Sequence, residues 1–336
     1  MHSRNEATAT LLQNGKVLVA GGFIDNQKLT NTSEIYDPTT NTWSEGPVMT
    51  FARADVGASL RPDGTVVIAG GYRGGQVFAS SSEIYSPGNG GSFTPGPMLG
   101  AGRSSFGAAT LDDGTFIIAG GYLGNAQAAT AVDVLGPNAV MFKSFNLLTP
   151  RMYGPAVQPL PGGKVIVFAG NNYQTGALDS AEVFDGQASH WTGSMSTPRQ
   201  WVASAALLDG TVLAIGGIDR AVTNLKSIER YDPNMGMWAP AGAMSGTRAY
   251  CRAAVVPSGK VLIAGGGFEQ ANYNWDPPFK STEVYDPNIG TTTPGPDLTE
   301  GRLAPTVTVL QDGSVLVVGG ANAIGPSSAV DRICVH

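Results

Sequence analysis

The sequence predicts an all-β fold, a closed ring of seven small antiparallel sheets called a β-propeller. The main observation is an apolar run ending in glycine that recurs seven times, with first glycines at Gly21, Gly70, Gly120, Gly170, Gly216, Gly265 and Gly319. Successive glycines are 46 to 54 residues apart, and a period of about 50 residues with short strands is typical of propellers. Glycine supplies 46 of the 336 residues, about twice its usual share, as expected for a chain rich in turns.

Each repeat begins with a predicted β-hairpin. A two-residue turn precedes each glycine: Asn14-Gly15, Asp63-Gly64, Asp113-Gly114, Gly162-Gly163, Asp209-Gly210, Ser258-Gly259 and Asp312-Gly313. Such dipeptides favour type I′ turns, whose twist matches that of the strands they join. The fourth repeat reads Gly170-Asn171 where the other six carry a glycine pair. We expect Asn171 to adopt the positive φ of a glycine, because asparagine tolerates that conformation well.

Two further strands complete each repeat. The third strand is marked by an acidic residue two positions before an aromatic or aliphatic one, the acids being Glu34, Glu83, Asp133, Glu182, Glu229, Glu283 and Asp331. An outer strand follows and often carries a large aromatic residue, namely Trp43, Phe93, Phe142, Trp191 and Trp238; the sixth repeat lacks one. The seventh repeat stops after its third strand. We therefore expect a three-stranded last blade, or an outer strand that lies upstream of this sequence.

The glycine pair, the Tyr-Asp-Pro at residues 36–38 and the outer Trp43 together resemble the kelch repeat, of the bacterial type, and the resemblance covers essentially the whole chain. It implies a seven-bladed kelch-type propeller with four antiparallel strands per blade, the last blade excepted. We expect residues 1–336 to form one domain, with approximate blades at 4–50, 51–100, 101–148, 149–196, 197–245, 246–299 and 300–336. The resemblance says little about function, because one fold hosts many functions.

An arginine precedes the first strand of every repeat: Arg4, Arg53, Arg103, Arg151, Arg199, Arg248 and Arg302. These seven arginines match the seven third-strand acids in number. One hypothesis is a ring of arginines for an anionic ligand. We favour a repeated structural ion pair, because a feature present in every blade builds the blade, whereas a ligand site should break the repeat.

The residues that follow these arginines, and the loops after the glycines, differ from blade to blade. In a kelch-type blade both segments open at one mouth of the central channel, which would gather aromatic rings, carboxylates and amides, as suits a sugar or a similar hydroxylated ligand. The candidate catalytic residues are Glu6, Asp55, Tyr153 and Tyr250. The candidate ligand-binding residues are Trp201, Tyr72, Arg73, Tyr122, Asn171, Asn172, Tyr173, Arg252, Phe268 and Trp275.

Two of these assignments have competing interpretations. Glu6 and Asp55 come from neighbouring blades, so each carboxylate could perturb the pKa of the other and let one act as an acid. Tyr72, Tyr122 and Tyr173 could instead share one blade position and pack between blades, which would give them a structural role.

Composition excludes several classes of function. The net charge is −6 with no basic run, which argues against nucleic acid as a partner, and no apolar stretch approaches the length of a membrane span. The only histidines are His2, His190 and His336, so we expect no metal site and no cofactor. In this the chain departs from the copper-radical oxidases that share the kelch fold. The compartment stays open between the cytoplasm and an extracytoplasmic location with the leader absent from this numbering.

Two functional hypotheses remain. The first is a monomeric binding protein that recognises a small hydroxylated or aromatic ligand or a glycan at the channel mouth, or a protein partner on the loop face. The second is a cofactor-independent acid–base enzyme of the isomerase, lyase or cyclase type at the same mouth, as in the sugar-isomerising members of the kelch group. We favour binding.

Overall fold

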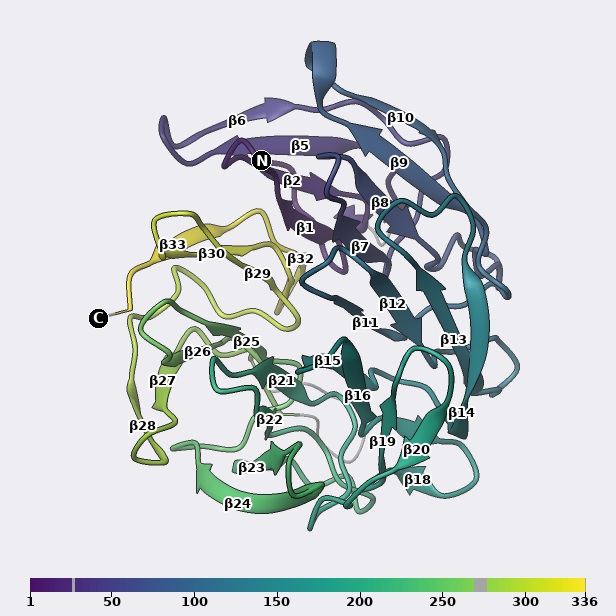
Figure 1. Cartoon of the computed structure of the whole chain (residues 1–336). Coiled ribbons are helices and arrows are strands. Elements are labelled where there is room, and N and C mark those ends of the chain that lie inside the picture. The colour runs from purple at the N-terminus through teal and green to yellow at the C-terminus, as the bar shows by residue number, and fades with distance from the viewer. Residues whose placement is uncertain (26–27, 269–276, 336) are drawn as a thin grey trace.

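The protein is a ring of seven antiparallel sheets, the blades, around a central channel (Figure 1). The computed structural model describes residues 1–25, 28–268 and 277–335. In these residues blades 1 to 6 have four strands each, and blade 7 has three, as the sequence predicts. The first strand of each blade lies at the centre and contacts the first strands of both neighbours, including β1 with β29.

The strands of each blade follow one another outward in chain order. In blades 1 to 4 they are β1(Thr8–Leu11), β2(Val17–Ala20), β5(Ser33–Asp37), β6(Thr42–Glu45); β7(Gly57–Leu60), β8(Val66–Ala69), β9(Ser82–Ser86), β10(Ser92–Pro95); β11(Gly107–Thr110), β12(Phe116–Ala119), β13(Ala129–Leu135), β14(Lys143–Arg151); β15(Ala156–Leu160), β16(Lys164–Phe168), β19(Ala181–Phe184) and β20(Ser189–Trp191). In blades 5 to 7 they are β21(Ala203–Ala206), β22(Val212–Ile215), β23(Ser227–Asp232), β24(Met237–Ala243); β25(Arg252–Val255), β26(Val261–Ala264), β27(Thr282–Asp286), β28(Thr291–Pro294); β29(Thr306–Val309), β30(Val315–Val318) and β33(Val330–Ile333).

Short hairpins extend some loops between the second and third strands. They are β3(Phe23–Ile24) with β4(Lys28–Leu29), β17(Asn171–Asn172) with β18(Gly176–Ala177), and β31(Ala321–Asn322) with β32(Gly325–Pro326). A 3-10 helix, η2(Gly88–Gly90), precedes β10. No helix among the described residues is long and apolar enough to span a membrane.

The core lies between adjacent blades. The second strand of a blade is buried on both sides, and its successive side chains point to opposite faces of the sheet. Val17 and Val19 of β2 therefore pack against blade 7, whereas Leu18 packs against Val66 and Ile68 of blade 2. This two-sided burial explains why the second strands read as continuous apolar runs with no alternation of polar residues.

The hairpin turns differ from the prediction. A type I′ turn needs positive φ at both central residues, but in the first turn only Gly15 has it (φ 80°), and Gly15 N–H donates to Leu12 O at 3.0 Å. The turn is thus of type I followed by a left-handed glycine, and Asn14 serves it through its side chain, which accepts a hydrogen bond from Lys16 N–H at 3.1 Å. The Gly162-Gly163 turn alone has both φ values positive, at 79° and 73°.

In the fourth repeat the pair of left-handed residues lies one position earlier than predicted. The residues with positive φ there are Ala169 (57°) and Gly170 (84°), and Asn171 instead begins β17. Arg151 confirms this equivalence, because it donates to Ala169 O at 3.0 Å as Arg53 donates to Gly70 O at 3.1 Å. The prediction that Asn171 replaces a left-handed glycine is wrong.

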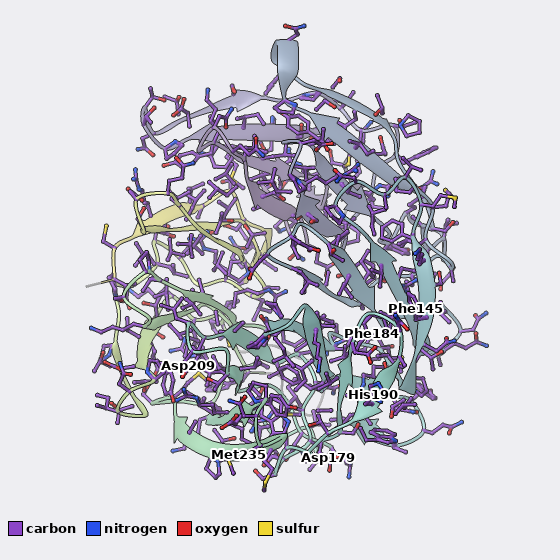
Figure 2. The ribbon with its side chains drawn as sticks, in the orientation of Figure 1. Phe145, Asp179, Phe184, His190, Asp209 and Met235 are labelled. Carbon is purple, nitrogen blue, oxygen red and sulfur yellow. The ribbon has the colours of Figure 1, made fainter. Side chains whose placement is uncertain are left out.

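The outer strands follow the prediction with one change. Trp43 pairs with Tyr36 and Phe93 with Tyr85, with ring centroids 5.1 and 5.4 Å apart. In blade 3, Phe142 precedes β14 and the strand aromatic is Phe145, whose ring lies 5.3 Å from that of Phe184 in blade 4 (Figure 2).

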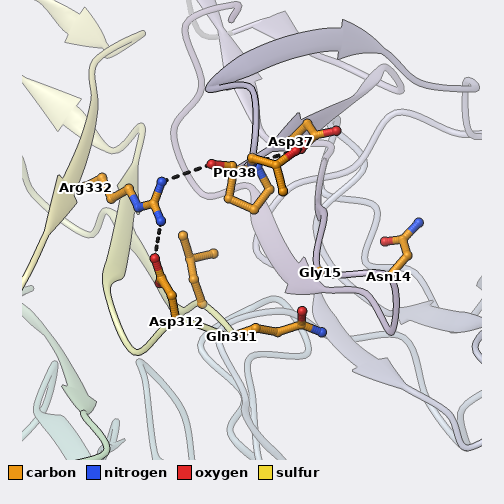
Figure 3. Close-up of a pocket in the computed structure, with 9 residues that line it drawn as sticks. Asn14, Gly15, Asp37, Pro38, Gln311, Asp312 and Arg332 are labelled. Carbon is orange, nitrogen blue, oxygen red and sulfur yellow. Dashed lines mark hydrogen bonds and ion pairs between the residues drawn. The ribbon is translucent and has the colours of Figure 1, made fainter.

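Blade 7 meets blade 1 through the same contacts that join other blades. Gly320 N–H donates to Arg4 O at 2.8 Å, as Gly22 N–H donates to Arg53 O at 2.8 Å. At the other end of the two blades, near their hairpin turns, Arg332 pairs with Asp312 and donates to Pro38 O at 3.0 Å (Figure 3). A cavity of about 260 Å³ lies at this seam. Because Arg230 makes the equivalent contacts with Asp209 and Pro287 O between blades 5 and 6, we assign the seam to the scaffold.

Candidate functional site

The seven arginines that precede the first strands are structural. Each forms an ion pair with the third-strand acid of its own blade, and six of the seven N–O distances lie between 2.6 and 3.1 Å. The pairs are almost fully buried. Glu229, for example, bonds Arg199 at 2.6 Å and also accepts hydrogen bonds from Ser196 N–H and Thr197 N–H at 2.7 and 3.3 Å. Each pair therefore fixes the chain where it enters a blade, and the arginine-ring hypothesis loses its basis.

A second ring of seven residues lies two positions after these arginines. Its members share a left-handed backbone, with φ between 45° and 56°, and are Glu6, Asp55, Ser105, Tyr153, Trp201, Tyr250 and Ala304. Hydrogen bonds join neighbours around the mouth, as from Asp55 N–H to Glu6 O at 2.9 Å and from Ala304 N–H to Tyr250 O at 2.8 Å. Left-handed φ is unusual for bulky residues and costs about 1–2 kcal/mol each. Every blade thus repeats the same left-handed backbone, which belongs to the scaffold, and only the side chain that it carries changes from blade to blade.

The side chains divide this mouth ring into two parts. Tyr153, Trp201 and Tyr250 of blades 4 to 6 stack in sequence, with centroids 5.7 and 4.7 Å apart and planes inclined by 25° and 23°. Glu6 and Asp55 of blades 1 and 2 supply carboxylates on the other part. The structure therefore brings together all four predicted catalytic residues and Trp201 at one end of the channel.

Asp55 and Arg252 are held close to this mouth. Ser105 donates to Asp55 Oδ2 twice, from its N–H at 2.6 Å and its hydroxyl at 2.7 Å, which fixes the carboxylate. Arg252 begins β25, where the other inner strands begin with Thr, Gly or Ala. Its guanidinium bonds Cys251 O at 3.2 Å, and no carboxylate in the described residues forms an ion pair with it. Arg252 therefore places a charged side chain, without an ion pair among the described residues, at a position where the other inner strands have small residues.

Glu6 titrates unusually. Its pKa is raised from 4.5 to about 7, chiefly because nearby protein atoms displace water from the carboxyl, although the side chain stays partly exposed at the mouth. The negative charge of Asp55 raises the pKa further, and the positive charge of Arg252 opposes the rise. The charge of Asp55 thus acts on Glu6 in the direction that the paired-carboxylate hypothesis requires, and the pairing stays a prediction.

A cavity of about 320 Å³ lies in the channel beneath this ring. Asp55, Ser105 and Trp201 line it at the mouth, and Gln158, Ser204 and Arg252 line it from the inner strands. Gln158 donates to Ser204 Oγ at 2.8 Å. The volume of the cavity falls in the range of about 300–1,000 Å³ that is typical of small-molecule sites.

Other predicted residues lie around this mouth with clear packing partners. The ring of Tyr72 lies between those of Phe23 and Phe78, at 6.2 and 5.7 Å, and Tyr122 stacks on Tyr153 at 5.7 Å. Asn171 donates to Gln200 Oε1 at 2.8 Å.

Two more candidates lie against neighbouring phenylalanines. The Arg73 guanidinium lies over the Phe51 ring at 3.7 Å, on the linker that leaves blade 1. Phe268 packs edge-on against Phe279 at 4.8 Å. Neither residue lines the channel cavity, and Trp275 lies outside the described residues.

The three tyrosines do not share one position. Tyr72 and Tyr122 are equivalent, because they form the same β-bridge to the residue after the arginine, with Ala54 and Ser104. In blade 4 that bridge is made by Asn171 with Met152, so Tyr173 lies two residues further on, at the tip of a hairpin. Asn172 and Tyr173 line a separate groove described below.

Sequence reasoning missed three polar residues of the cavity, although each left a signal. Ser105 occupies the same place after an arginine as Glu6 and Asp55. Gln158 and Ser204 are polar residues in inner strands that are otherwise small and apolar.

Potential metal ligands lie apart from one another in the described residues. In the described part of the chain no three His, Cys, Asp or Glu side chains gather closely enough to hold an ion. His190 lies on the outer strand β20 and contacts Asp185 at 3.0 Å, far along the blade from the inner strands (Figure 2). Burial raises the pKa of Cys251 to about 11, which opposes thiolate formation.

Comparison with known proteins agrees with this architecture. The family model described as the Kelch motif matches residues 8–50 and 203–245, which are blades 1 and 5. The chain thus matches the kelch motif in two of its seven blades. Kelch-like protein 25 of Xenopus tropicalis is 26% identical over 124 residues, and Kelch-like protein terF of Aspergillus terreus is 32% identical over 130 residues. Each match covers 37% of this chain, but only 20% and 27% of the relative.

Two solved structures share the fold. A fungal alcohol oxidase of the AA5 family, in complex with copper, aligns with a TM-score of 0.74 at 18% identity, over 97% of this chain and 72% of the oxidase chain. YjhT aligns with a TM-score of 0.63 at 15% identity, over 83% of this chain and 93% of its own. At such identities the likeness concerns the fold alone.

Proposed function

We propose that this kelch propeller is a binding protein that takes a small hydroxylated ligand with an apolar or aromatic face into the mouth of its channel. The observation that carries the proposal is the combination of the mouth ring and the cavity below it. The ring presents Trp201 and the carboxylate of Asp55 to the same cavity, and Arg252 adds a guanidinium from β25. A ligand hydroxyl can donate to Asp55 and accept from Arg252, while Trp201 contacts its apolar face.

The fixed carboxylate of Asp55 supports a preorganised site. Asp55 needs no rearrangement to accept a hydrogen bond, because Ser105 already fixes its carboxylate. Fixing the binding groups before the ligand arrives reduces the entropy lost on binding. The fold does not require charged or aromatic residues at these left-handed positions, because alanine occupies the equivalent position in blade 7, at Ala304.

One observation favours a second function, acid–base catalysis without a cofactor. Glu6 has a pKa of about 7 beside a second carboxylate, and proton transfer is most efficient when the pKa of the catalytic group is near the working pH. In this alternative the ligand is bound higher, at the mouth ring, where Glu6 exchanges a proton with it; Glu6, Tyr153 and Tyr250 belong to this ring and do not line the cavity below it. The kelch-like relatives raise a third use, a protein partner on the loop face, which would not require the cavity.

A thermal-shift screen with neutral sugars, sugar acids and aromatic metabolites tests the proposal, followed by calorimetry and by proton NMR of each hit. We expect a hit whose affinity falls about tenfold or more in Asp55→Asn and in Arg252→Met, the size of one lost charge-assisted hydrogen bond. Arg73→Met is the matched control, because Arg73 lies on Phe51 outside the cavity.

The outcomes separate the candidate functions. A hit that binds both channel variants as tightly as the native protein would refute a channel site. Conversion of the ligand into a product in the NMR tube, lost in Glu6→Gln, would replace binding with catalysis. A screen without any hit would leave the loop face as the functional surface.

A further inference from the structure

A second cavity lies away from the channel, between the loops of blades 3 and 4, with a volume of about 530 Å³. One wall is the loop that follows β12, and the other is the tip of the β17–β18 hairpin. Its lining residues are Leu123, Asn125, Ala126, Gln127, Ala128, Pro150, Asn172, Tyr173 and Gln174. We call this cavity the amide groove.

The amide groove combines carboxamides with a mainly apolar lining and carries no charged side chain. Four of its nine residues are carboxamides, from Asn125, Gln127, Asn172 and Gln174, and each carboxamide has both donors and acceptors. Among the described residues, none accepts a hydrogen bond from their amide groups; the one side-chain bond is that of Asn172 Oδ1, which accepts from Gln174 N–H at 3.0 Å. The groove can therefore both donate to and accept from a ligand.

Tyr173 adds an aromatic surface at the hairpin tip. Its side chain is 70% exposed, and no ring of the described residues covers it. This exposure contrasts with Tyr72 and Tyr122, which pack among other rings. An exposed ring bordered by carboxamides offers an apolar face and directed hydrogen bonds at the same place, a combination that fits a sugar ring with its apolar face and peripheral hydroxyls.

Both walls are held in shape by backbone bonds. Leu123 N–H donates to Gln127 O, and Gln127 N–H to Gly124 O, each at 3.0 Å. Within this loop Asn125 and Ala126 both have left-handed φ, of 50° and 57°, a conformation that is strained for alanine. A preformed groove of this kind loses little entropy when it binds a ligand.

The amide groove departs from the repeat. The equivalent loops carry a charged residue in blade 2 (Arg73) and in blade 5 (Asp219 and Arg220), whereas the loop of blade 7 is also uncharged; only blades 3 and 4 place two uncharged loops side by side. Arg220 does approach the far side of the β17–β18 hairpin, where it donates to Ala177 O at 2.8 Å and pairs with Asp179 at 3.5 Å. Its charge is therefore used outside the groove.

We propose that the amide groove binds a neutral carbohydrate, with one pyranose ring stacked on Tyr173 and its hydroxyls bonded to the carboxamides of both loops. The absence of charge inside the groove favours a neutral sugar over a uronic or sialic acid, because no cation there compensates a carboxylate. This site is independent of the channel, since it shares no lining residue with the channel cavity.

Calorimetric titration of the whole protein with four neutral hexasaccharides tests the proposal: those of β-1,4-glucose, xylose, mannose and N-acetylglucosamine. We expect at least one to bind, and Tyr173→Ala to weaken it about tenfold or more, since a ring contact contributes both buried area and stacking. Gln174→Ala should weaken it less. Hexagalacturonic acid should bind more weakly than the neutral sugar.

Two matched variants separate this site from others. Trp191→Ala removes another exposed aromatic, on the outer strand β20, and should leave binding unchanged. Arg252→Met should also leave it unchanged, whereas the channel proposal predicts a loss for channel ligands. Failure of all four sugars to bind at millimolar concentration would overturn the inference, as would binding that survives Tyr173→Ala.

Discussion

Replacing Arg199 with methionine tests whether the buried ion pairs hold the blades together. The guanidinium donates to Gly216 O at 2.9 Å, to Ser227 O at 3.0 Å and to Ser227 Oγ at 2.9 Å, besides its pair with Glu229 at 2.6 Å. Methionine keeps the aliphatic part of the side chain but removes the guanidinium and with it every donor. The variant therefore removes the polar contacts while most of the packing of the aliphatic part remains.

The expected loss follows from the state in which the variant leaves Glu229. Removing one partner of a buried ion pair costs about 3–5 kcal/mol, because the remaining charge is unpaired. Glu229 keeps two backbone donors, from Ser196 and Thr197, so we expect the lower end, about 3 kcal/mol. The double variant Arg199→Met/Glu229→Leu removes the stranded charge and should be more stable than Arg199→Met alone.

Urea unfolding followed by both far-UV circular dichroism and tryptophan fluorescence measures these differences, provided that the two transitions coincide. Arg220→Met is the matched control, because Arg220 is half exposed and lies 3.5 Å from Asp179. An exposed pair contributes less than about 1 kcal/mol. A loss below about 1 kcal/mol in Arg199→Met would refute the structural role assigned to the seven pairs.

Three further predictions concern single residues. By carbon-13 NMR the Glu6 carboxyl should titrate near pH 7, and Asp55→Asn should lower that pKa; a native midpoint near 4.5 would contradict the site. Because folding raises this pKa, the contribution of Glu6 to stability should decrease as the pH rises from about 4.5 to about 7. Gly71→Ala should cost about 2–4 kcal/mol in urea unfolding, since a Cβ would meet Ala54 O at 2.5 Å and φ is 94°. Asp63→Ala should cost about 1 kcal/mol by the same measurement, because Asp63 accepts a turn bond from a backbone N–H.

Much of the fold could be predicted because a propeller repeats its own local rules. Turn dipeptides, apolar second strands and an arginine matched to an acid recur in each blade, so one repeat checks another. The errors arose where two local conformations use the same residues. Asp-Gly suits both a type I′ turn and a type I turn with a left-handed glycine, and only the φ of Asp63 distinguishes them.

The site could be predicted in part for the same reason. Glu6, Asp55, Tyr153, Trp201 and Tyr250 were found because they vary at a place where the neighbouring arginine does not. Their left-handed backbone could not be found, since it follows from hydrogen bonds between adjacent blades.

The sequence by itself determined the number of blades, the order of their strands and the arginine–acid pairs, because these depend on contacts within one repeat of about 50 residues. Only the tertiary structure decided which varying residues meet. It placed Asp55 beside Ser105 and within the same cavity as Arg252, and it moved Asn172 and Tyr173 out of the channel into the amide groove. The physical reason is that ring closure sets the distances between blades, and no local sequence pattern encodes that closure.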